Sequence, residues 1–460
     1  MYDLIVIGGG PAGCAAALRA AQMGGQVLLV EKDKLGGACL HWGCIPSKVL
    51  FHHSEILESY RDALDNNLIE GSITFNVDRA NKRQKEVVEQ LYLGLQDLFS
   101  KSNIEIVVGR ALVRGAGSVL VTNEVEQEFV GRNILIAGGL QKSSFSYSGA
   151  TGVQEVEQSL QLPSKPCRVA VIGGGNTGLE LASAYSSFDF NVTVVEKEKL
   201  LIPALRDEEL SKWLAFFLKR RGLKLFTGST VENIKQIDGP NNPIMQIVIS
   251  RSGKEEVINA DLIINASGRK PCLDFLAPEC AIVKSTTNCL SVNEYMETSV
   301  KGIYAAGDIT GPPMLASLAY FEGITAAMNA MGVKKKLNKD AVPSIVAARP
   351  AVAWVGLTEK EATEKGIKPQ KDSFPFASCG AAVIRGEEEG FVKLIAGEDG
   401  IVIGMQVLGA SAEELIMEGT LAIRHGLNIQ ELSETIHPHP TQHEAVWETS
   451  LLMNGYPMYG

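Results

Sequence analysis

The sequence predicts an α/β protein with two nucleotide-binding units of the βαβ type, because one pattern occurs twice along the chain. Both copies begin with an apolar strand and continue through a glycine-rich turn into a helix and a second strand. Both end on a glutamate. The distance from the first glycine to this glutamate is 23 positions in each copy, from Gly8 to Glu31 and from Gly173 to Glu196. At 460 residues the chain is long enough for roughly two to four domains.

The first copy has an apolar strand at 4–7, an alanine-rich helix to about Met23 and a second strand at 27–30. Glycines in its turn allow a sharp bend and let the backbone approach a pyrophosphate, while the helix N-terminus faces the phosphates. The terminal acid, Glu31, is expected to accept hydrogen bonds from ribose hydroxyls. This context favours a dinucleotide site over a simple glycine-rich turn, with candidate residues Gly8, Gly10, Pro11, Ala12 and Gly13.

The second copy has strands at 169–172 and 192–195, joined by a helix through Tyr185. Its acid, Glu196, should accept from a 2′-hydroxyl and repel a 2′-phosphate, which favours NAD over NADP even though lysines follow at 197 and 199. Two dinucleotides bound by one chain imply electron transfer between them. The candidate residues of this turn are Gly173, Gly175, Asn176, Thr177 and Gly178.

Between the two copies, apolar residues recur at helical spacing among charges from about Asn76 to Lys101, which predicts a long amphipathic helix. Its charged residues are typical of a solvated face. Strands are expected at 104–108, 119–121 and 133–136, returning to the first unit, with 134–139 as the crossover out of it.

Two cysteines with four residues between them, Cys39 and Cys44, follow the first unit directly. Such a pair can close a small, reducible ring that exchanges by thiolate attack, whereas a bare pair elsewhere is more often buried and inert. The place behind a dinucleotide turn favours a redox centre. Eight cysteines are too sparse in 460 residues for a disulfide scaffold, which fits a reducing compartment.

Bulk composition is that of an ordinary globular protein, with 45% hydrophobic and 21% charged residues. The net charge of −10 argues against a nucleic-acid partner, which needs a basic face. The N-terminus lacks the basic region of a signal peptide, and the glycines at 8–13 interrupt its apolar run before it can span a bilayer. We therefore expect a cytoplasmic protein without a membrane partner.

Four further segments, 266–271, 303–308, 352–359 and 437–444, follow the two glycine turns and the G-x-C-L-x-x-G-C-I-P-S-K run at 37–48. With these blocks the chain resembles, over nearly its whole length, the flavoprotein pyridine nucleotide-disulfide oxidoreductases, and within them most of all the dihydrolipoamide dehydrogenases. The C-terminus has no extra cysteine pair, which disfavours mercuric and large thioredoxin reductases.

The resemblance implies two Rossmann-like domains and a C-terminal α+β dimerisation domain. The FAD domain would comprise 1–145 and 270–340, the NAD domain 146–269, and the dimerisation domain 341–460. Besides the first turn, the residues implied for FAD are Glu31, Gly37, Ala38, Cys39, Lys48, Ala111, Gly138, Gly307, Asp308 and Ala316. Besides the second turn, those implied for NAD are Glu180, Glu196, Ala266, Gly268 and Arg269.

The chemistry implied by the resemblance is oxidation of a dihydrolipoyl dithiol, small or protein-bound, through a Cys39–Cys44 disulfide and FAD to reduce NAD. Cys44 would lie against the flavin and Cys39 would face the substrate. Lys48 would pair with Glu180 near the flavin. His439 and Glu444 would form a base that reaches the disulfide of the other subunit, so the active enzyme is expected to be a homodimer.

Several alternatives remain open from the sequence. His437 and His443 crowd the His439 segment, but this spacing lacks the thiolate or carboxylate context of a strong zinc motif, so no metal is predicted. Asn176 and Ser317 depart from the family pattern and bear on nicotinamide access and substrate identity. The rival functions are a reductase of another disulfide, quinone or metal, a similar enzyme serving a non-standard lipoate-binding protein, and a flavin redox sensor without turnover.

Overall fold

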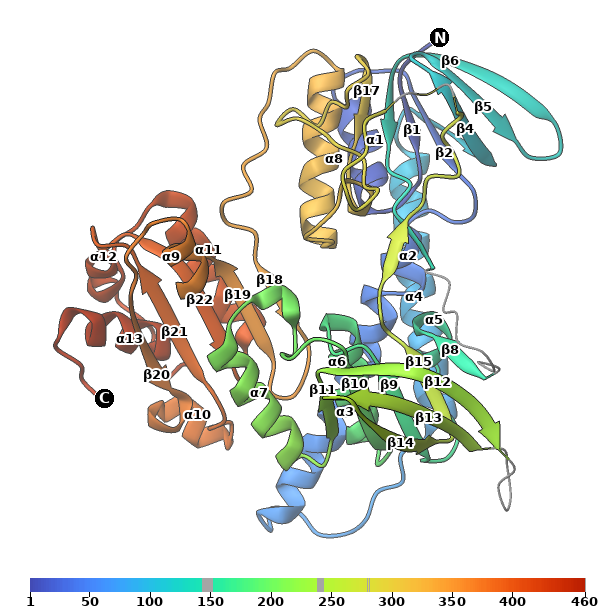
Figure 1. Cartoon of the computed structure of the whole chain (residues 1–460). Coiled ribbons are helices and arrows are strands. Elements are labelled where there is room, and N and C mark those ends of the chain that lie inside the picture. The colour runs from blue at the N-terminus through green and yellow to red at the C-terminus, as the bar shows by residue number, and fades with distance from the viewer. Residues whose placement is uncertain (143–151, 238–243, 279, 281, 460) are drawn as a thin grey trace. The chain divides into compact units, whose positions relative to one another are not determined.

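The computed structural model describes residues 1–142, 152–237, 244–278, 280 and 282–459 (Figure 1). The chain divides into two compact units, which are described separately below. Unit 1 comprises Met1–Val49, Arg79–Ser144 and Gly268–Asn338, and unit 2 comprises Leu50–Asp78, Phe145–Ser267 and Lys339–Gly460.

Unit 1 is built on a sheet whose central strands are parallel and are buried over residues 4–7, 27–31 and 134–136. Burial on both faces explains why residues 4–7 are a continuous apolar run rather than an alternating one. The strand order is β3 (Ile104–Val108), β2 (Val27–Glu31), β1 (Tyr2–Ile7), β6 (Glu126–Ile136), β5 (Ser118–Thr122) and β4 (Arg110–Gly115), with β17 (Ile303–Ala305) also paired to β6.

Helices α1 (Pro11–Gln22) and α8 (Ala316–Ala330) pack side by side on this sheet (Figure 1). Their backbones approach so closely that a Cβ on Gly323 would lie 2.1 Å from the carbonyl oxygen of Ala12. The remaining elements of unit 1 are α2 (Gly37–His41), the start of α3 (Cys44–Asp65), α4 (Val77–Ser100), the ribbon of β7 (Leu140–Lys142) with β16 (Arg269–Pro271), and the short helix η2 (Asp308–Thr310).

Unit 2 contains a second parallel sheet, in the order β11 (Lys224–Thr227), β10 (Asn191–Glu196), β9 (Arg168–Ile172), β15 (Leu262–Asn265) and β8 (Val153–Glu155). An antiparallel sheet of β12 (Ser229–Ile237), β13 (Ile244–Arg251) and β14 (Lys254–Ala260) packs against it through a shared apolar core. The helical elements here are α5 (Val156–Ser159), α6 (Asn176–Ser187), η1 (Pro203–Leu205) and α7 (Glu208–Arg220).

The C-terminal part of unit 2 is an antiparallel sheet with helices around it. Its order is β18 (Ser344–Val346), β19 (Val352–Gly356), β22 (Val402–Leu408), β21 (Phe391–Ala396) and β20 (Gln370–Pro375). The helices are α9 (Glu359–Glu364), η3 (Phe376–Ser378), α10 (Gly380–Arg385), α11 (Ala412–His425), α12 (Ile429–Glu434) and α13 (Glu444–Asn454).

The α/β class and the predicted strands and helices are confirmed. Their ends differ from the predicted ones by at most two residues, except that β6 begins at Glu126 rather than at 133. The grouping of segments differs from the expected one at 50–78, which belongs to unit 2. Leu50 and Leu57 pack there in one apolar core with Leu179 and Tyr185. The expected boundary at 145/146 lies outside the described residues, and the division into three domains stays a prediction.

Within the described part of the chain, no helix is long and apolar enough to cross a membrane.

Candidate functional site

The first glycine turn has the geometry that a dinucleotide site requires. Gly8 has φ +99°, and a Cβ there would lie 2.4 Å from the Ala137 carbonyl oxygen; a Cβ on Gly13 would lie 1.8 Å from the Gly8 carbonyl oxygen. The position of a Cβ on Gly10, in contrast, has no atom within 4 Å. Because Pro11 begins α1 directly after this open position, the turn fits a pyrophosphate at a helix N-terminus.

Glu31 at the end of β2 is buried and holds this turn together. Its carboxylate accepts from the Gly9 backbone N–H at 2.6 Å and from the Asp33 backbone N–H at 2.9 Å. The sequence predicts only one role for Glu31, which is to accept hydrogen bonds from the ribose hydroxyls. The structure adds a second role, because each carboxylate oxygen also satisfies a backbone donor of the fold.

The second glycine turn makes nearly the same contacts as the first. A Cβ on Gly173 would lie 2.4 Å from the Ala266 carbonyl oxygen, and one on Gly178 would lie 1.9 Å from the Gly173 carbonyl oxygen. Glu196 accepts from Gly174 N–H at 2.5 Å and from Glu198 N–H at 2.7 Å. Gly175 caps α6, which begins at Asn176 and Thr177. The fit to a second dinucleotide is therefore as good as the fit to the first.

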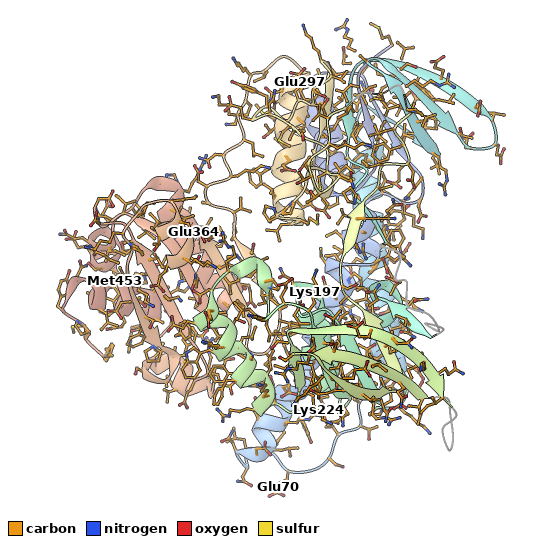
Figure 2. The ribbon with its side chains drawn as sticks, viewed as in Figure 1. Glu70, Lys197, Lys224, Glu297, Glu364 and Met453 are labelled. Atoms are coloured by element: carbon orange, nitrogen blue, oxygen red, sulfur yellow. The ribbon has the colours of Figure 1, made fainter. Side chains whose placement is uncertain are left out.

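Lys197 follows Glu196 and is labelled in Figure 2. Its side chain is 77% exposed and its nearest acid is Glu198, at 4.0 Å. Glu196, in contrast, is buried against the turn. The acid at the end of β10 is therefore fixed, whereas the lysine beside it lies in solvent.

The other residues expected near FAD lie in unit 1. Gly307 has φ +81° and donates its N–H to Glu322, a buried acid that the sequence reading missed, at 2.8 Å. Asp308 begins η2, and burial, followed by the negative charge of Glu322, raises the pKa of its carboxyl. Gly138 has a packing reason to be glycine, because a Cβ would lie 2.0 Å from the Phe275 ring. Gly37 and Ala38 lie in α2, Ala111 in β4 and Ala316 at the start of α8.

Cys39 and Cys44 lie on either side of the break between α2 and α3. Neither cysteine is in a disulfide in this structure; Cys39 is half-buried and Cys44 is exposed. A hydrogen bond to Cys44 and then burial raise the pKa of Cys39. The two sulfurs are therefore neighbours, as the short spacing predicts.

A largely apolar cavity of about 620 Å³ lies beside Cys39. Apolar side chains from α1, α4 and α8 form most of its wall, and Arg19 and Gln22 supply polar groups. Within the described part of the chain, the buried Nε of Arg19 has no hydrogen-bond partner. The sequence reading missed this cavity because helix periodicity does not distinguish a pocket wall from core. The cavity is lined by, among others, Cys39, Leu18, Leu91, Leu95, Leu98 and Ile324.

Lys48 and Glu180 belong to different units: Lys48 lies near the start of α3 in unit 1, and Glu180 lies on α6 in unit 2. Within unit 2, Glu180 accepts from the Ala347 backbone N–H at 3.0 Å. The NAD candidates are divided in the same way, with Ala266 in unit 2 and Gly268 and Arg269 in unit 1. The Lys48–Glu180 pair and the complete NAD site stay predictions.

His439 and Glu444 are brought together in the C-terminal part of unit 2. The His439 Nδ1 lies 2.8 Å from the Glu444 Oε1, and the other carboxylate oxygen accepts from the Thr441 backbone N–H at 3.0 Å. Glu444 is buried at the start of α13, whereas the His439 side chain is 69% exposed. A carboxylate on Nδ1 fixes the tautomer that leaves Nε2 as a base.

Two further histidines flank this pair and share one carboxylate. The His437 Nε2 lies 2.7 Å from the Glu418 Oε1, and the His443 Nδ1 lies 3.1 Å from the Glu418 Oε2. Among the described residues, no group of three histidine, cysteine or acidic side chains has the arrangement of a metal site.

Comparisons with known proteins agree with this arrangement. Residues 2–323 match the family described as pyridine nucleotide-disulphide oxidoreductase, and residues 342–450 match its dimerisation domain. Proteins named dihydrolipoyl dehydrogenase are similar over nearly full length: one from Bacillus subtilis is 32% identical over 99% of this chain and 98% of its own, and one from Thermus scotoductus is 36% identical over 98% and 96%.

Solved structures share the fold. The HOCl-induced flavoprotein disulfide reductase RclA from Escherichia coli, solved as a Cu(II) complex, superposes with a TM-score of 0.86 at 26% identity over 98% of this chain and 99% of its own. LpdA from Mycobacterium tuberculosis superposes with a TM-score of 0.88 at 24% identity over 98% and 99%, which supports the fold alone. FAD and NAD are the cofactors of the dihydrolipoyl dehydrogenases in this family. The chain belongs to the pyridine nucleotide-disulphide oxidoreductase family and is a flavoprotein disulfide oxidoreductase.

Proposed function

We propose that this chain is a dihydrolipoamide dehydrogenase, which oxidises a protein-bound dihydrolipoyl dithiol through a Cys39–Cys44 disulfide and FAD and reduces NAD. The observation that carries the proposal is the position of Cys39, which hydrogen-bonds to Cys44 and lines an apolar cavity in the unit that holds the first dinucleotide turn. Relatives named dihydrolipoyl dehydrogenase, similar over nearly the whole chain, support it.

The cavity favours a dithiol on an apolar chain. Leu18, Leu91 and Leu95 offer dispersion contacts to methylene groups, whereas a charged peptide disulfide would lose hydration against such a wall without compensation. Arg19 and Gln22 supply the donors that the carbonyl of a lipoyl amide requires. A lipoyl arm therefore fits the chemistry of this lining better than glutathione disulfide does.

Exchange would begin when a substrate thiolate attacks the Cys39 sulfur of the disulfide, so that the S–S bond breaks and Cys44 leaves as a thiolate. The second substrate thiol then attacks the substrate sulfur in the mixed disulfide. Cys39 is released as a thiol, and the substrate leaves as a cyclic disulfide that has lost two electrons and two protons. When bound, FAD would carry two electrons from the protein dithiol to NAD.

A base is needed because both substrate thiols lose protons. His439 offers Nε2 to a thiol proton, while Glu444 holds Nδ1 and stabilises the imidazolium that forms. We place this base at the disulfide of a second subunit in a homodimer, with the match of 342–450 to a dimerisation domain as support. The sparse cysteines support a reducing, cytoplasmic compartment for the reaction.

A substrate panel tests the proposal on the FAD-loaded protein. Dihydrolipoamide with NAD, and NADH with lipoamide, glutathione disulfide, a quinone or Cu(II), would be compared for wild type and Cys39→Ser. We expect wild type to have its highest kcat/KM with dihydrolipoamide and NAD and with lipoamide and NADH. Cys39→Ser should lose both of these activities. Lipoyl turnover no greater in wild type than in Cys39→Ser would contradict the proposal.

The second candidate function is an NAD(P)H-dependent reductase of another disulfide, a quinone or a metal. The structural similarity to RclA, which was solved with Cu(II), favours it. The same panel decides between the two, because this candidate requires Cu(II), quinone or glutathione disulfide to exceed lipoamide in kcat/KM.

A further inference from the structure

The segment that carries His439 is held at both ends by a single carboxylate. Glu418, on α11, contacts His437 through Oε1 at 2.7 Å and His443 through Oε2 at 3.1 Å. His437 precedes His439 by two positions, and His443 follows it by four. Both carboxylate oxygens of Glu418 are therefore used to fix the backbone on either side of the proposed base.

The contacts of His437 favour a ring that carries a proton on each nitrogen. Its Nδ1 lies 2.8 Å from the Thr435 carbonyl oxygen, and its Nε2 faces Glu418, so both ring nitrogens face acceptors. The side chain is only 5% exposed and stacks on Trp447 of α13. Burial acts to lower the pKa of His437, but the hydrogen bond and charge of Glu418, with Thr435 and Glu444, raise it above its usual value.

This arrangement is distinct from the proposed base. His439 bonds to Glu444 at the start of α13, whereas Glu418 approaches from α11 and contacts only the flanking histidines among the hydrogen bonds of the described residues. A charge-assisted hydrogen bond between buried groups is strong and directional. The ion pair of His437 with Glu418 therefore limits the freedom of a segment whose central side chain is itself 69% exposed.

We propose that Glu418 is a positioning residue, which clamps His437 and His443 and thereby holds the His439 imidazole where it can accept a thiol proton. The inference rests on the proposed function for its effect on turnover, but the clamp itself is a property of the free protein. Because Glu418 acts through His439, its removal matters only while His439 is present.

The test compares Glu418→Gln with Glu414→Gln in the FAD-loaded full chain. Glu414 is an exposed acid on the same helix, so the control makes the same charge change without touching the histidines. Hydrogen exchange followed by mass spectrometry should show peptides over 435–443 exchanging about tenfold faster in Glu418→Gln and unchanged in Glu414→Gln. Equal exchange in the two variants would overturn the clamp.

A double-mutant cycle shows whether the clamp acts through His439. Glu418→Gln should lower kcat/KM for dihydrolipoamide roughly tenfold to a hundredfold in wild type and have no further effect in His439→Gln. NADH oxidation by ferricyanide, which needs no thiol base, should not change. A loss that is equally large in the His439→Gln background would overturn the positioning role. If wild type fails to oxidise dihydrolipoamide, the proposed function fails, and hydrogen exchange still decides the clamp.

Discussion

Glu31 and Glu196 make equivalent contacts in the two halves of the chain. Each accepts from a backbone N–H inside its glycine turn and from the N–H two residues further on. A carboxylate held in this way is pre-organised, because its position does not depend on a bound nucleotide. At both positions, the carboxylate that is expected to bind the ribose therefore also stabilises the glycine turn.

Glu196 predicts the choice of nicotinamide coenzyme. A fixed carboxylate accepts from a 2′-hydroxyl and repels a 2′-phosphate, so kcat/KM with NAD should exceed that with NADP by more than about tenfold, or about 1.4 kcal/mol. Steady-state kinetics with both coenzymes measure this ratio. Lys197→Ala serves as the control and should leave the ratio nearly unchanged, because that side chain is 77% exposed. Equal use of NAD and NADP would contradict the role of Glu196.

The two cysteines should differ in how they affect the flavin spectrum. A hydrogen bond to Cys44, followed by burial, raises the pKa of the Cys39 thiol. In the proposed mechanism, Cys44 is the sulfur that lies against the flavin. We expect two-electron reduction of the holoenzyme to produce a long-wavelength absorbance that Cys39→Ser retains and Cys44→Ser loses. A dithionite titration that gives only fully reduced flavin at every step in wild type would show that Cys44 does not lie against the flavin.

At the scale of elements, a buried ion pair joins α7 to the C-terminal sheet within unit 2. Lys393 on β21 is 1% exposed and contacts Asp207 at 2.7 Å and Glu209 at 3.1 Å. Asp207 also caps α7 by accepting from the Leu210 N–H at 2.8 Å. Burial acts to raise the pKa of Asp207, but the hydrogen bonds from Lys393 and Leu210 outweigh it and hold that pKa below its usual value.

Lys393→Met should therefore destabilise unit 2. It leaves the Asp207 charge buried without its cation, which costs about 3–5 kcal/mol in the free energy of unfolding. Because the pKa of Asp207 is lowered by folding, its stabilising contribution is present above its unfolded pKa and is lost as pH falls through the folded pKa. Chemical denaturation at neutral and acid pH should show the Lys393→Met deficit shrinking as the acid protonates.

Two variants check this reading of the ion pair. Lys393→Met combined with Asp207→Asn should recover much of the lost stability, since no buried charge is then left without its partner, and Glu209 is 47% exposed. Lys371→Met, which removes a 41% exposed lysine bonded to Glu209 and Glu359, should cost no more than about 1 kcal/mol. If Lys393→Met lowers the free energy of unfolding by the same amount at every pH, and by no more than Lys371→Met does, the ion pair does not stabilise unit 2 as argued.

At the scale of the whole molecule, the features that depend on a local sequence pattern could be predicted from the sequence. The glycine turns and the parallel strands follow from short-range spacing, and the structure contains them. The structure also contains the pair of His439 with Glu444, which the family resemblance implied. Packing between distant segments was not predictable. Glu418 lies on α11, 19 positions before His437, which lies in the loop between α12 and α13. The cavity beside Cys39 is formed by several elements whose apolar faces look like ordinary core in the sequence.

The most direct measurement of the central claim is complementation in a heterodimer, because Cys44 lies in unit 1 and His439 in unit 2, and the proposed site takes one from each subunit. A purified heterodimer of Cys44→Ser with His439→Gln contains one site with both lesions and one with neither. It should recover up to half of the wild-type dihydrolipoamide:NAD activity, while each mutant homodimer stays nearly inactive. A folded, FAD-loaded heterodimer as inactive as the homodimers would contradict the account, because His439 would then not serve the disulfide of its partner subunit.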